Sequence, residues 1–341
     1  MRTWPIIGHE WAVRQLQMAI MRDDVPHALL ITGAENGGKM TLAHTLTQAL
    51  LCTAPPEERP CGACLACRKV ESGNHPDVMS IGPEEKGRAL KIEYIREVES
   101  FLALTPNEGA HKIALVRNFE RATIGAANAL LKTLEEPPAY AHLILLATNT
   151  ESLLPTIVSR SQQINLRPLA KSIIEQALIE RWELAPEKAE RLARIAGGRL
   201  GWAVRAATAT AYLKRMEDAV ATLLNLLHQD IPARFEVAAS LAKDDAQLAD
   251  ALEYWLAAWR DVLLIQTNNL SAVTYREHQS TLQTIAQRVD VPITVDVLEM
   301  LEEAQVALQK NANTQLLTEN VILTLPHLPE LKASLAQADQ I

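Results

Sequence analysis

The 341-residue sequence contains no run of about 18 apolar residues, the length that a transmembrane helix needs. Its first residues also lack the continuous apolar core of a signal peptide. We therefore expect no membrane partner and a location in the cytoplasm. The chain has no excess of positive charge either. Its net charge of −8 argues against a broad basic surface that coats nucleic acid, but it does not exclude a local patch.

Cysteine is absent outside one short segment. All four cysteines follow the spacing Cys52-x8-Cys61-x2-Cys64-x2-Cys67. In a reducing compartment such a cluster indicates a metal site rather than disulfides. Four thiolates with no open position favour a structural, tetrahedral Zn²⁺ site that staples a polar insertion at residues 52–75. Four free thiols are one alternative. An iron–sulfur cluster is another, although the polar residues that flank the loop favour zinc.

The first half of the chain alternates short apolar runs with helical patterns, which is typical of a parallel α/β sheet. Five strands are predicted, at Ala28–Ile31, Val78–Ile81, Ile113–Val116, Leu143–Ala147 and Gln163–Leu166. After Pro168 the strand patterns end and only amphipathic helices follow. We therefore predict an α/β nucleotide-type domain at residues 1–168, a small helical lid at 169–207 and an all-helical domain at 208–341.

A phosphate-binding loop is indicated between the first strand and the helix that follows it. The segment from Gly33 to Lys39 reads Gly-Ala-Glu-Asn-Gly-Gly-Lys, which has the form G-x-x-x-x-G-K. Gly33, Gly37 and Gly38 let backbone N–H groups surround phosphate oxygens, and Lys39 is expected to reach the β- and γ-phosphates. The alternative is a glycine-rich turn that binds nothing.

The groups that nucleotide hydrolysis needs are missing. Met40 stands where a Ser or Thr hydroxyl binds Mg²⁺, and Thr41, kept as a nucleotide-binding candidate, points about 100° away on a helix. The strand that ends at Val116 continues into Arg117-Asn118 instead of the Asp-Glu pair that holds Mg²⁺ and orients the attacking water. We therefore predict a chain that binds ATP or ADP without efficient hydrolysis and does not act as a catalyst alone.

A resemblance to the clamp-loader AAA+ subunits rests on four elements in a fixed order. His27-Ala28 precedes the phosphate loop, and the cysteine cluster follows its helix. Asn128–Pro138 reads Asn-Ala-Leu-Leu-Lys-Thr-Leu-Glu-Glu-Pro-Pro, and Ser159-Arg160-Ser161 comes last. The resemblance covers residues 5–205 well and the later helices only by layout. It implies an AAA+ P-loop domain with a five-stranded parallel sheet and a zinc-bearing insertion, a helical lid and an all-α collar that oligomerises.

The resemblance also implies roles for single residues. Arg160 corresponds to an arginine finger that reaches a neighbouring subunit's ATP, with Ser161 in place of the family's Cys. Asn149 stands where the family has its γ-phosphate sensor, and Gly201 replaces the second sensor Arg of the hydrolysing subunits. Elements that act in cis are lost while the finger given in trans is kept. The pattern therefore resembles the delta-prime type of subunit more than the gamma/tau motor.

For such a subunit the resemblance implies help in loading the sliding clamp of DNA polymerase III on primed DNA, with gamma/tau and delta subunits as partners. Arg88, Lys91 and Arg96 are candidates to touch the DNA backbone, and a solvated helix face explains them equally well. Two rival functions stay open. One is an active gamma/tau-like or other AAA+ ATPase with unorthodox metal ligands, and the other is a zinc-bearing DNA-binding adaptor without nucleotide.

Overall fold

A computed structural model of the protein describes residues 3–83, 89–309, 312–329 and 331. The chain forms two compact units, Met1–Val204 and Arg205–Ile341. Most of the segment predicted as the lid belongs to the first unit, so a lid that is a separate domain stays a prediction. No helix in the described ranges combines the length and apolar character that crossing a membrane requires.

A five-stranded parallel sheet forms the centre of the first unit, which confirms the predicted fold class. Its strand order is β2-β3-β4-β1-β5. Every residue of β1 and β4 is buried, as expected for strands covered on both faces. Each predicted strand lies inside an observed one, which extends it by at most two residues at one end: β1 (Ala28–Gly33), β2 (Val78–Ile81), β3 (Lys112–Val116), β4 (Ala141–Ala147) and β5 (Gln162–Leu166).

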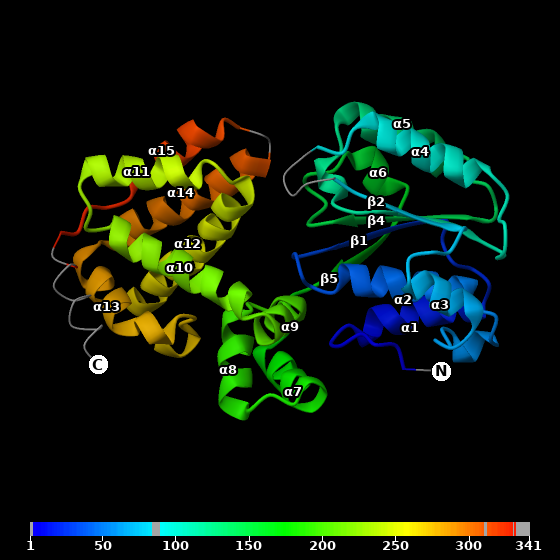
Figure 1. Ribbon diagram of the computed structural model, residues 1–341, viewed down its shortest axis with the longest axis horizontal. Coiled ribbons are helices and arrows are strands. Elements are labelled where there is room, and N and C mark those ends of the chain that lie inside the picture. Colours follow the sequence, from blue (N-terminus) through cyan, green and yellow to red (C-terminus); the bar gives the residue numbers. More distant parts are fainter. Residues whose placement is uncertain (1–2, 84–88, 310–311, 330, 332–341) are drawn as a thin grey trace. The chain divides into compact units, whose positions relative to one another are not determined.

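Helices cover both faces of this sheet (Figure 1). Side chains alternate along a strand, so β1 sends Leu29 and Ile31 to one hydrophobic cluster and Ala28 and Leu30 to the other. The first cluster includes α1 (Glu10–Met21), α2 (Lys39–Leu51) and α3 (Leu65–Glu71). The second includes α4 (Ile92–Ala103), α5 (Ile124–Glu135) and α6 (Pro155–Ser159). With both faces closed, the strand ends are where a ligand can reach the sheet.

Short elements complete the first unit. The 3₁₀ turns η1 (Pro56–Glu58) and η2 (Phe119–Arg121) lie in the loops after α2 and β3. After β5, the helices α7 (Lys171–Trp182) and α8 (Pro186–Ile195) pack against each other. They lead to α9 (Leu200–Thr208), which begins in the first unit and ends in the second.

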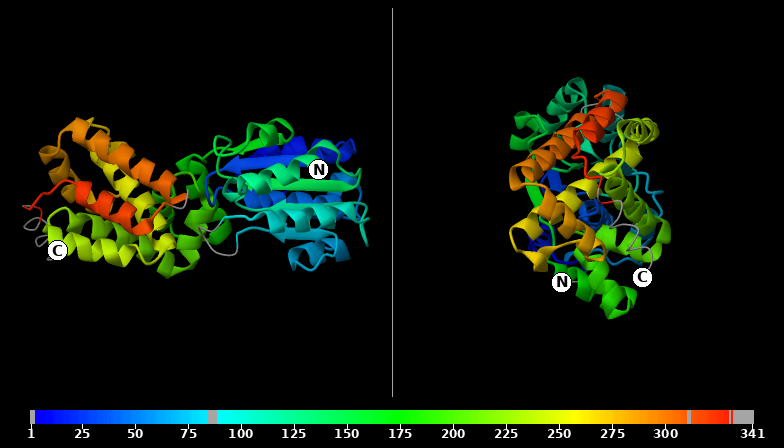
Figure 2. Two further views of the ribbon diagram at one scale, coloured as in Figure 1. Left: turned by 90° about the horizontal axis from the view of Figure 1, so that it is seen from above. Right: turned by 90° about the vertical axis from the view of Figure 1, so that its left-hand side faces the viewer.

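The described residues of the second unit after α9 form only helices, and Figure 2 shows them packed side by side. α12 (Asp245–Gln266) is central, because α10, α13 and α14 all pack against it and it buries Trp255 and Trp259. The other elements are α10 (Thr210–Leu226), α11 (Ile231–Leu241), η3 (Leu270–Ala272), η4 (Arg276–His278), α13 (Gln279–Arg288), α14 (Val291–Gln309) and α15 (Thr314–Thr324).

Two buried charged side chains tie the ends of helices in this second unit. Asp261 of α12 accepts hydrogen bonds from the backbone N–H groups of Thr274 and Tyr275, at 2.8 and 2.7 Å. Arg234 of α11 donates to carbonyls at the end of α15, including that of Leu325 at 2.7 Å. The last carbonyls of a helix lack partners within the helix and carry the negative end of its dipole. The guanidinium therefore satisfies groups that α15 leaves unpaired.

A buried ion pair fixes the amino ends of β2 and β3. Asp77 precedes β2 and accepts backbone hydrogen bonds from residues 107–109 at 2.6–2.9 Å. Lys112, the first residue of β3, lies 3.4 Å from the Asp77 carboxylate and 4.5 Å from the centre of the Phe101 ring. Burial by itself raises the pKa of Asp77, but these hydrogen bonds outweigh it and lower the pKa to about 2.

We expect Asp77→Asn to lower the free energy of unfolding by about 3 kcal/mol, because an amide N–H₂ would then face backbone donors and Lys112 would lose its counter-charge. The wild-type contribution should also depend on pH. The folded pKa lies below the unfolded value of about 3.9, so the stabilisation is present above about pH 4 and is lost as the pH falls towards about 2. Urea unfolding at several pH values measures both effects. Equal midpoints for the variant and the wild type at pH 7 would contradict this role.

Candidate functional site

The phosphate loop predicted from the sequence joins β1 to α2 at the carboxyl edge of the sheet. Asn36 and Gly38 have φ values of 59° and 98°, and these left-handed conformations let the chain curl before α2 begins at Lys39. Gly33 lies against β5, where an added Cβ would be 2.5 Å from the carbonyl oxygen of Leu166. Glycine at position 33 is therefore required by the packing of the sheet, whether or not a ligand binds.

The side chain of Lys39 binds its own loop. Its Nζ donates to the carbonyl oxygens of Gly33 and Ala34, at 2.6 and 2.9 Å. Burial lowers the pKa of Lys39, and the negative charges of Glu120 and Glu35 oppose that shift. A phosphate that entered the loop would have to replace both carbonyls as the partner of the ammonium group.

Gly201, near the start of α9, lies directly on the phosphate loop. Its N–H donates to the carbonyl oxygen of Asn36 at 2.9 Å. A Cβ at position 201 would lie only 2.7 Å from the same oxygen. The resemblance places a sensor Arg at this position in the hydrolysing subunits. Glycine instead permits a backbone contact that any larger residue would push apart.

The carboxyl end of β3 supplies no acid at the two positions where the motif has them. The N–H of Arg117 donates to Ile81 at 2.8 Å, and the Arg117 side chain packs against Gly82, where an added Cβ would be 3.2 Å from its Nε. Asn118 adopts a left-handed conformation with a φ of 51°. On α2, Met40 is 40% exposed, and Thr41 is also exposed. This arrangement offers poor ligands for Mg²⁺, which prefers oxygen.

Glu120 is an acidic residue near the loop that sequence reasoning missed. It lies in the turn η2 after β3, and its Oε2 atom is buried without a hydrogen-bond partner among the described residues. Its charge acts on Lys39, which places the carboxylate near the phosphate loop. The motif search considered only the residues that directly follow the strand. The turn that brings Glu120 back towards the loop is a tertiary feature without a sequence signature.

Asn149 follows β4, which pairs with β1, so it lies at the same edge of the sheet as the phosphate loop. Its Oδ1 accepts hydrogen bonds from the backbone N–H and the hydroxyl of Ser152, at 3.1 and 2.9 Å. The turn thereby orients the amide group. A sensor role for Asn149 stays a prediction, as do the nucleotide-binding roles of Gly37, Gly38 and Lys39.

Arg160 lies at the opposite edge of the sheet. It follows α6 and precedes β5, whose register pairs Gln162 with Leu29 and Leu166 with Gly33. At the usual rise of about 3.3 Å per residue, this stretch of strand alone separates Arg160 from the phosphate loop by about 13 Å. The side chain of Arg160 is 38% exposed and its Nη2 lies 2.7 Å from a carboxylate oxygen of Glu135. Arg160 is therefore not a ligand of its own chain's phosphate loop.

The predicted DNA contacts gain no support from their surroundings. Lys91 and Arg96 are exposed at the start and on the surface of α4. The same helix exposes Glu93 and Glu97, so this face carries charges of both signs. Arg88 lies outside the described residues. Binding of DNA by these side chains stays a prediction.

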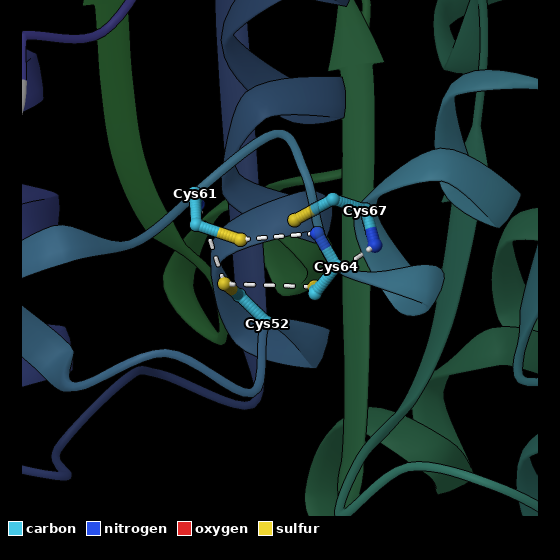
Figure 3. A group of neighbouring side chains, drawn as sticks. All are labelled: Cys52, Cys61, Cys64 and Cys67. Carbon is cyan, nitrogen blue, oxygen red and sulfur yellow. Dashed lines mark hydrogen bonds between the residues drawn. The ribbon is translucent and has the colours of Figure 1, made fainter.

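The four cysteines converge on one point, as the spacing predicts (Figure 3). Cys52 ends α2, Cys61 lies in the following loop, Cys64 caps α3 and Cys67 lies within α3. All four sulfur atoms lie within 4.8 Å of one another. A tetrahedron with Zn–S bonds of about 2.3 Å needs sulfur separations of about 3.8 Å, and the Cys52 and Cys64 sulfurs are 4.0 Å apart. A small contraction of the cluster would therefore hold a zinc ion.

Backbone groups prepare these sulfurs for a metal. The N–H groups of Cys61, Cys64 and Cys67 point at the sulfurs of Cys52, Cys61 and Cys64, with separations of 3.3, 3.3 and 3.4 Å. Burial raises the pKa of Cys64, but N–H groups, including that of Cys67, outweigh it and lower the pKa to about 6. Burial raises the pKa of the Cys67 thiol. Metal binding must therefore release protons, chiefly from the more buried thiols.

Comparisons with known proteins give a consistent result. A model of the family described as DNA polymerase III, delta subunit, matches residues 8–170. The chain is 30% identical over 318 residues to the DNA polymerase III subunit delta-prime of Bacillus subtilis, covering 92% of this chain and 94% of the relative. It is 31% identical over 176 residues to the DNA polymerase III subunit tau of the same organism, covering 52% of this chain and 30% of the relative.

The solved structures include a DNA polymerase III gamma subunit-related protein from Thermotoga maritima, 19% identical to this chain. The match covers 94% of this chain and 99% of that structure, with a TM-score of 0.48. The likeness to the delta-prime relative thus runs through nearly the whole of both chains, whereas the likeness to the tau relative is confined to about half of this one.

We expect the purified protein to contain about one equivalent of zinc, and Cys64→Ser to reduce it to below about a tenth, because structural zinc sites need all four ligands. Without the metal, residues 52–75 should become sensitive to protease while the sheet stays folded, since these residues pack mainly on α2. Elemental analysis of protein purified without added metal, with limited proteolysis, gives both readings. Iron in place of zinc, or no metal in the wild type, would contradict the assignment.

Proposed function

The chain belongs to the family of DNA polymerase III delta-prime subunits, and from this premise we propose that it is a clamp-loader subunit whose own nucleotide site does not hydrolyse ATP. It acts in the cytoplasm with gamma/tau and delta subunits to load the sliding clamp on primed DNA. One observation carries the loss of hydrolysis. Arg117 and Asn118 stand where an acidic pair is needed, while the strand and loop around them are kept. The second, all-helical unit would serve as the collar through which the subunits assemble.

Charge shows how far the changed strand end disfavours a catalytic metal. Two unit charges about 4 Å apart interact with roughly 4 kcal/mol at an effective dielectric constant of about 20. Replacing the acid by Arg117 turns that attraction for Mg²⁺ into a repulsion of the same order, and Met40 offers no oxygen ligand. Binding of ATP or ADP would also require Lys39 to leave Gly33 and Ala34. We therefore propose weak nucleotide binding without efficient hydrolysis.

The position of Arg160 supports its proposed action on a neighbouring subunit. It lies at the amino edge of the sheet, about 13 Å or more from its own phosphate loop along β1. A guanidinium there can reach transferring phosphoryl oxygens only when they belong to another chain. The planar fork and permanent charge of Arg suit that task.

An active ATPase is the one rival that a specific observation favours. Glu120 places a carboxylate near Lys39, and its buried Oε2 has no partner among the described residues. An unorthodox motor could use that group to hold a metal ion or to orient water. The rival predicts hydrolysis that depends on Glu120, whereas a subunit without hydrolysis has no rate for Glu120→Gln to change.

The purified chain alone should hydrolyse ATP at background, because the hydroxyl, the acidic pair and the sensor Arg are all replaced. Steady-state phosphate release from the wild type, Lys39→Ala and Glu120→Gln tests this. A wild-type rate of about 1 s⁻¹, the low end for ordinary enzymes, that is abolished in both variants would establish the rival instead.

In an assembly with gamma/tau and delta subunits, Arg160→Ala should leave assembly intact and lower the DNA-stimulated ATPase only in part. Arginine fingers accelerate phosphoryl transfer by about 10³–10⁵, but this chain completes one site among several. Clamp loading should fall further than the ATPase, because it needs the sites to act together. Arg160→Lys should restore little, since an ammonium group cannot copy the planar fork. Wild-type loading by a correctly assembled Arg160→Ala complex would refute the finger role.

A further inference from the structure

We propose that Glu135 is the positioning residue for Arg160, holding its guanidinium in the orientation in which it meets a neighbour's nucleotide. The inference rests on the finger role proposed above. Glu135 is the last residue of α5, and Arg160 follows the last residue of α6. α5 and α6 pack against each other (Figure 1).

Two contacts define the orientation of Arg160. Its Nη2 lies 2.7 Å from Oε1 of Glu135, and its Nη1 donates to the carbonyl oxygen of Thr156 at 3.3 Å. Thr156 is in the first turn of α6, so the side chain folds back along its own helix and is met there by the carboxylate from α5. One end of the guanidinium is thus held by two elements.

Glu135 can hold Arg160 in place because its own backbone is fixed. The preceding carbonyl, that of Leu134, accepts a hydrogen bond from Nε2 of His27 at 3.1 Å. His27 directly precedes β1, the central strand that continues into the phosphate loop, and the side chain of Leu134 is buried in the core. A chain of direct contacts therefore runs from the amino end of β1 through α5 to the guanidinium.

Arg160 keeps donors for a ligand while both contacts stay in place. A guanidinium carries five N–H donors, two on each Nη and one on Nε. Each Nη atom uses one hydrogen in the contacts described, so each can offer its second hydrogen to a phosphoryl oxygen. A carboxylate that occupied the fork with both oxygens would block this, but the ion pair here is formed by Oε1.

Stability does not explain the pair. The two side chains are 38% and 51% exposed, and ion pairs of this kind contribute little to folding. An unrestrained Arg side chain samples many rotamers, and the neighbour's nucleotide would have to select one of them. A fixed carboxylate removes that search, and small displacements of catalytic groups cost up to about 100-fold in rate.

The test is a double-mutant cycle in the full assembly with gamma/tau and delta subunits. DNA-stimulated ATPase is measured for the wild type, Glu135→Gln, Arg160→Ala and the double variant. The rate lost in Arg160→Ala defines the part that depends on the finger. Glu135→Gln should reduce that part about tenfold through kcat with KM unchanged, because the group is displaced but not removed. In the Arg160→Ala background, Glu135→Gln should have no further effect.

Glu136→Gln is the matched control, because it removes the same charge from the adjacent exposed residue and should leave the rate unchanged. Glu135→Asp keeps the charge with a shorter reach and should give an intermediate rate. The thermal unfolding midpoint of Glu135→Gln should stay within about 3 °C of the wild type, as expected for an exposed pair.

Three outcomes would overturn the inference. If Glu135→Gln hydrolyses ATP as fast as the wild type or faster while Arg160→Ala is slow, Glu135 does not position the finger and at most restrains it. If Glu135→Gln lowers the rate further in the Arg160→Ala background, Glu135 acts elsewhere. If Arg160→Ala itself has no effect, the finger role fails first, and the positioning role fails with it.

Discussion

The parallel pairing of β1 with both β4 and β5 is the constraint on which the rest of the structure depends. It places the phosphate loop and Asn149 at the carboxyl edge of the sheet and Arg160 at the amino edge. One chain cannot bring both edges to the same phosphate, because the strand between them is rigid and fully buried. A site that uses both kinds of group must therefore be assembled from two chains. The sheet separates what a chain receives from what it gives.

At the carboxyl edge, contacts within the chain replace the contacts that a nucleotide would make. Lys39 is satisfied by Gly33 and Ala34, and α9 rests on the loop through Gly201. These contacts are internally consistent, since each donor has an acceptor and the glycine gives the close approach its room. The loop thus has a structural role even without a ligand, which explains how its glycines can be retained while the metal-binding groups are lost.

Elsewhere, polar groups hold segments that have little apolar core of their own. The Asp77 carboxylate gathers three backbone N–H groups of one loop, Arg234 closes the end of α15, and four sulfurs gather the insertion after α2. Each of these is a buried or partly buried group that would be costly without its partners. Segments of this kind owe their shape to a few specific interactions, whereas the sheet owes its shape to many unspecific ones.

The sequence by itself determined the sheet, the phosphate loop, the cysteine cluster and the clamp-loader family. Strand periodicity, the order of glycines and the spacing of cysteines are local patterns that physical chemistry interprets directly. Only the tertiary structure showed that Lys39 turns back on its loop, that Gly201 touches Asn36, that Glu120 lies near Lys39 and that Glu135 meets Arg160. Those pairs are separated by a few residues in one case and by 25 to 165 in others, and the direction of each side chain is set by the packing of helices on the sheet. A local pattern fixes which residues form an element, but the packing of elements decides which side chains meet.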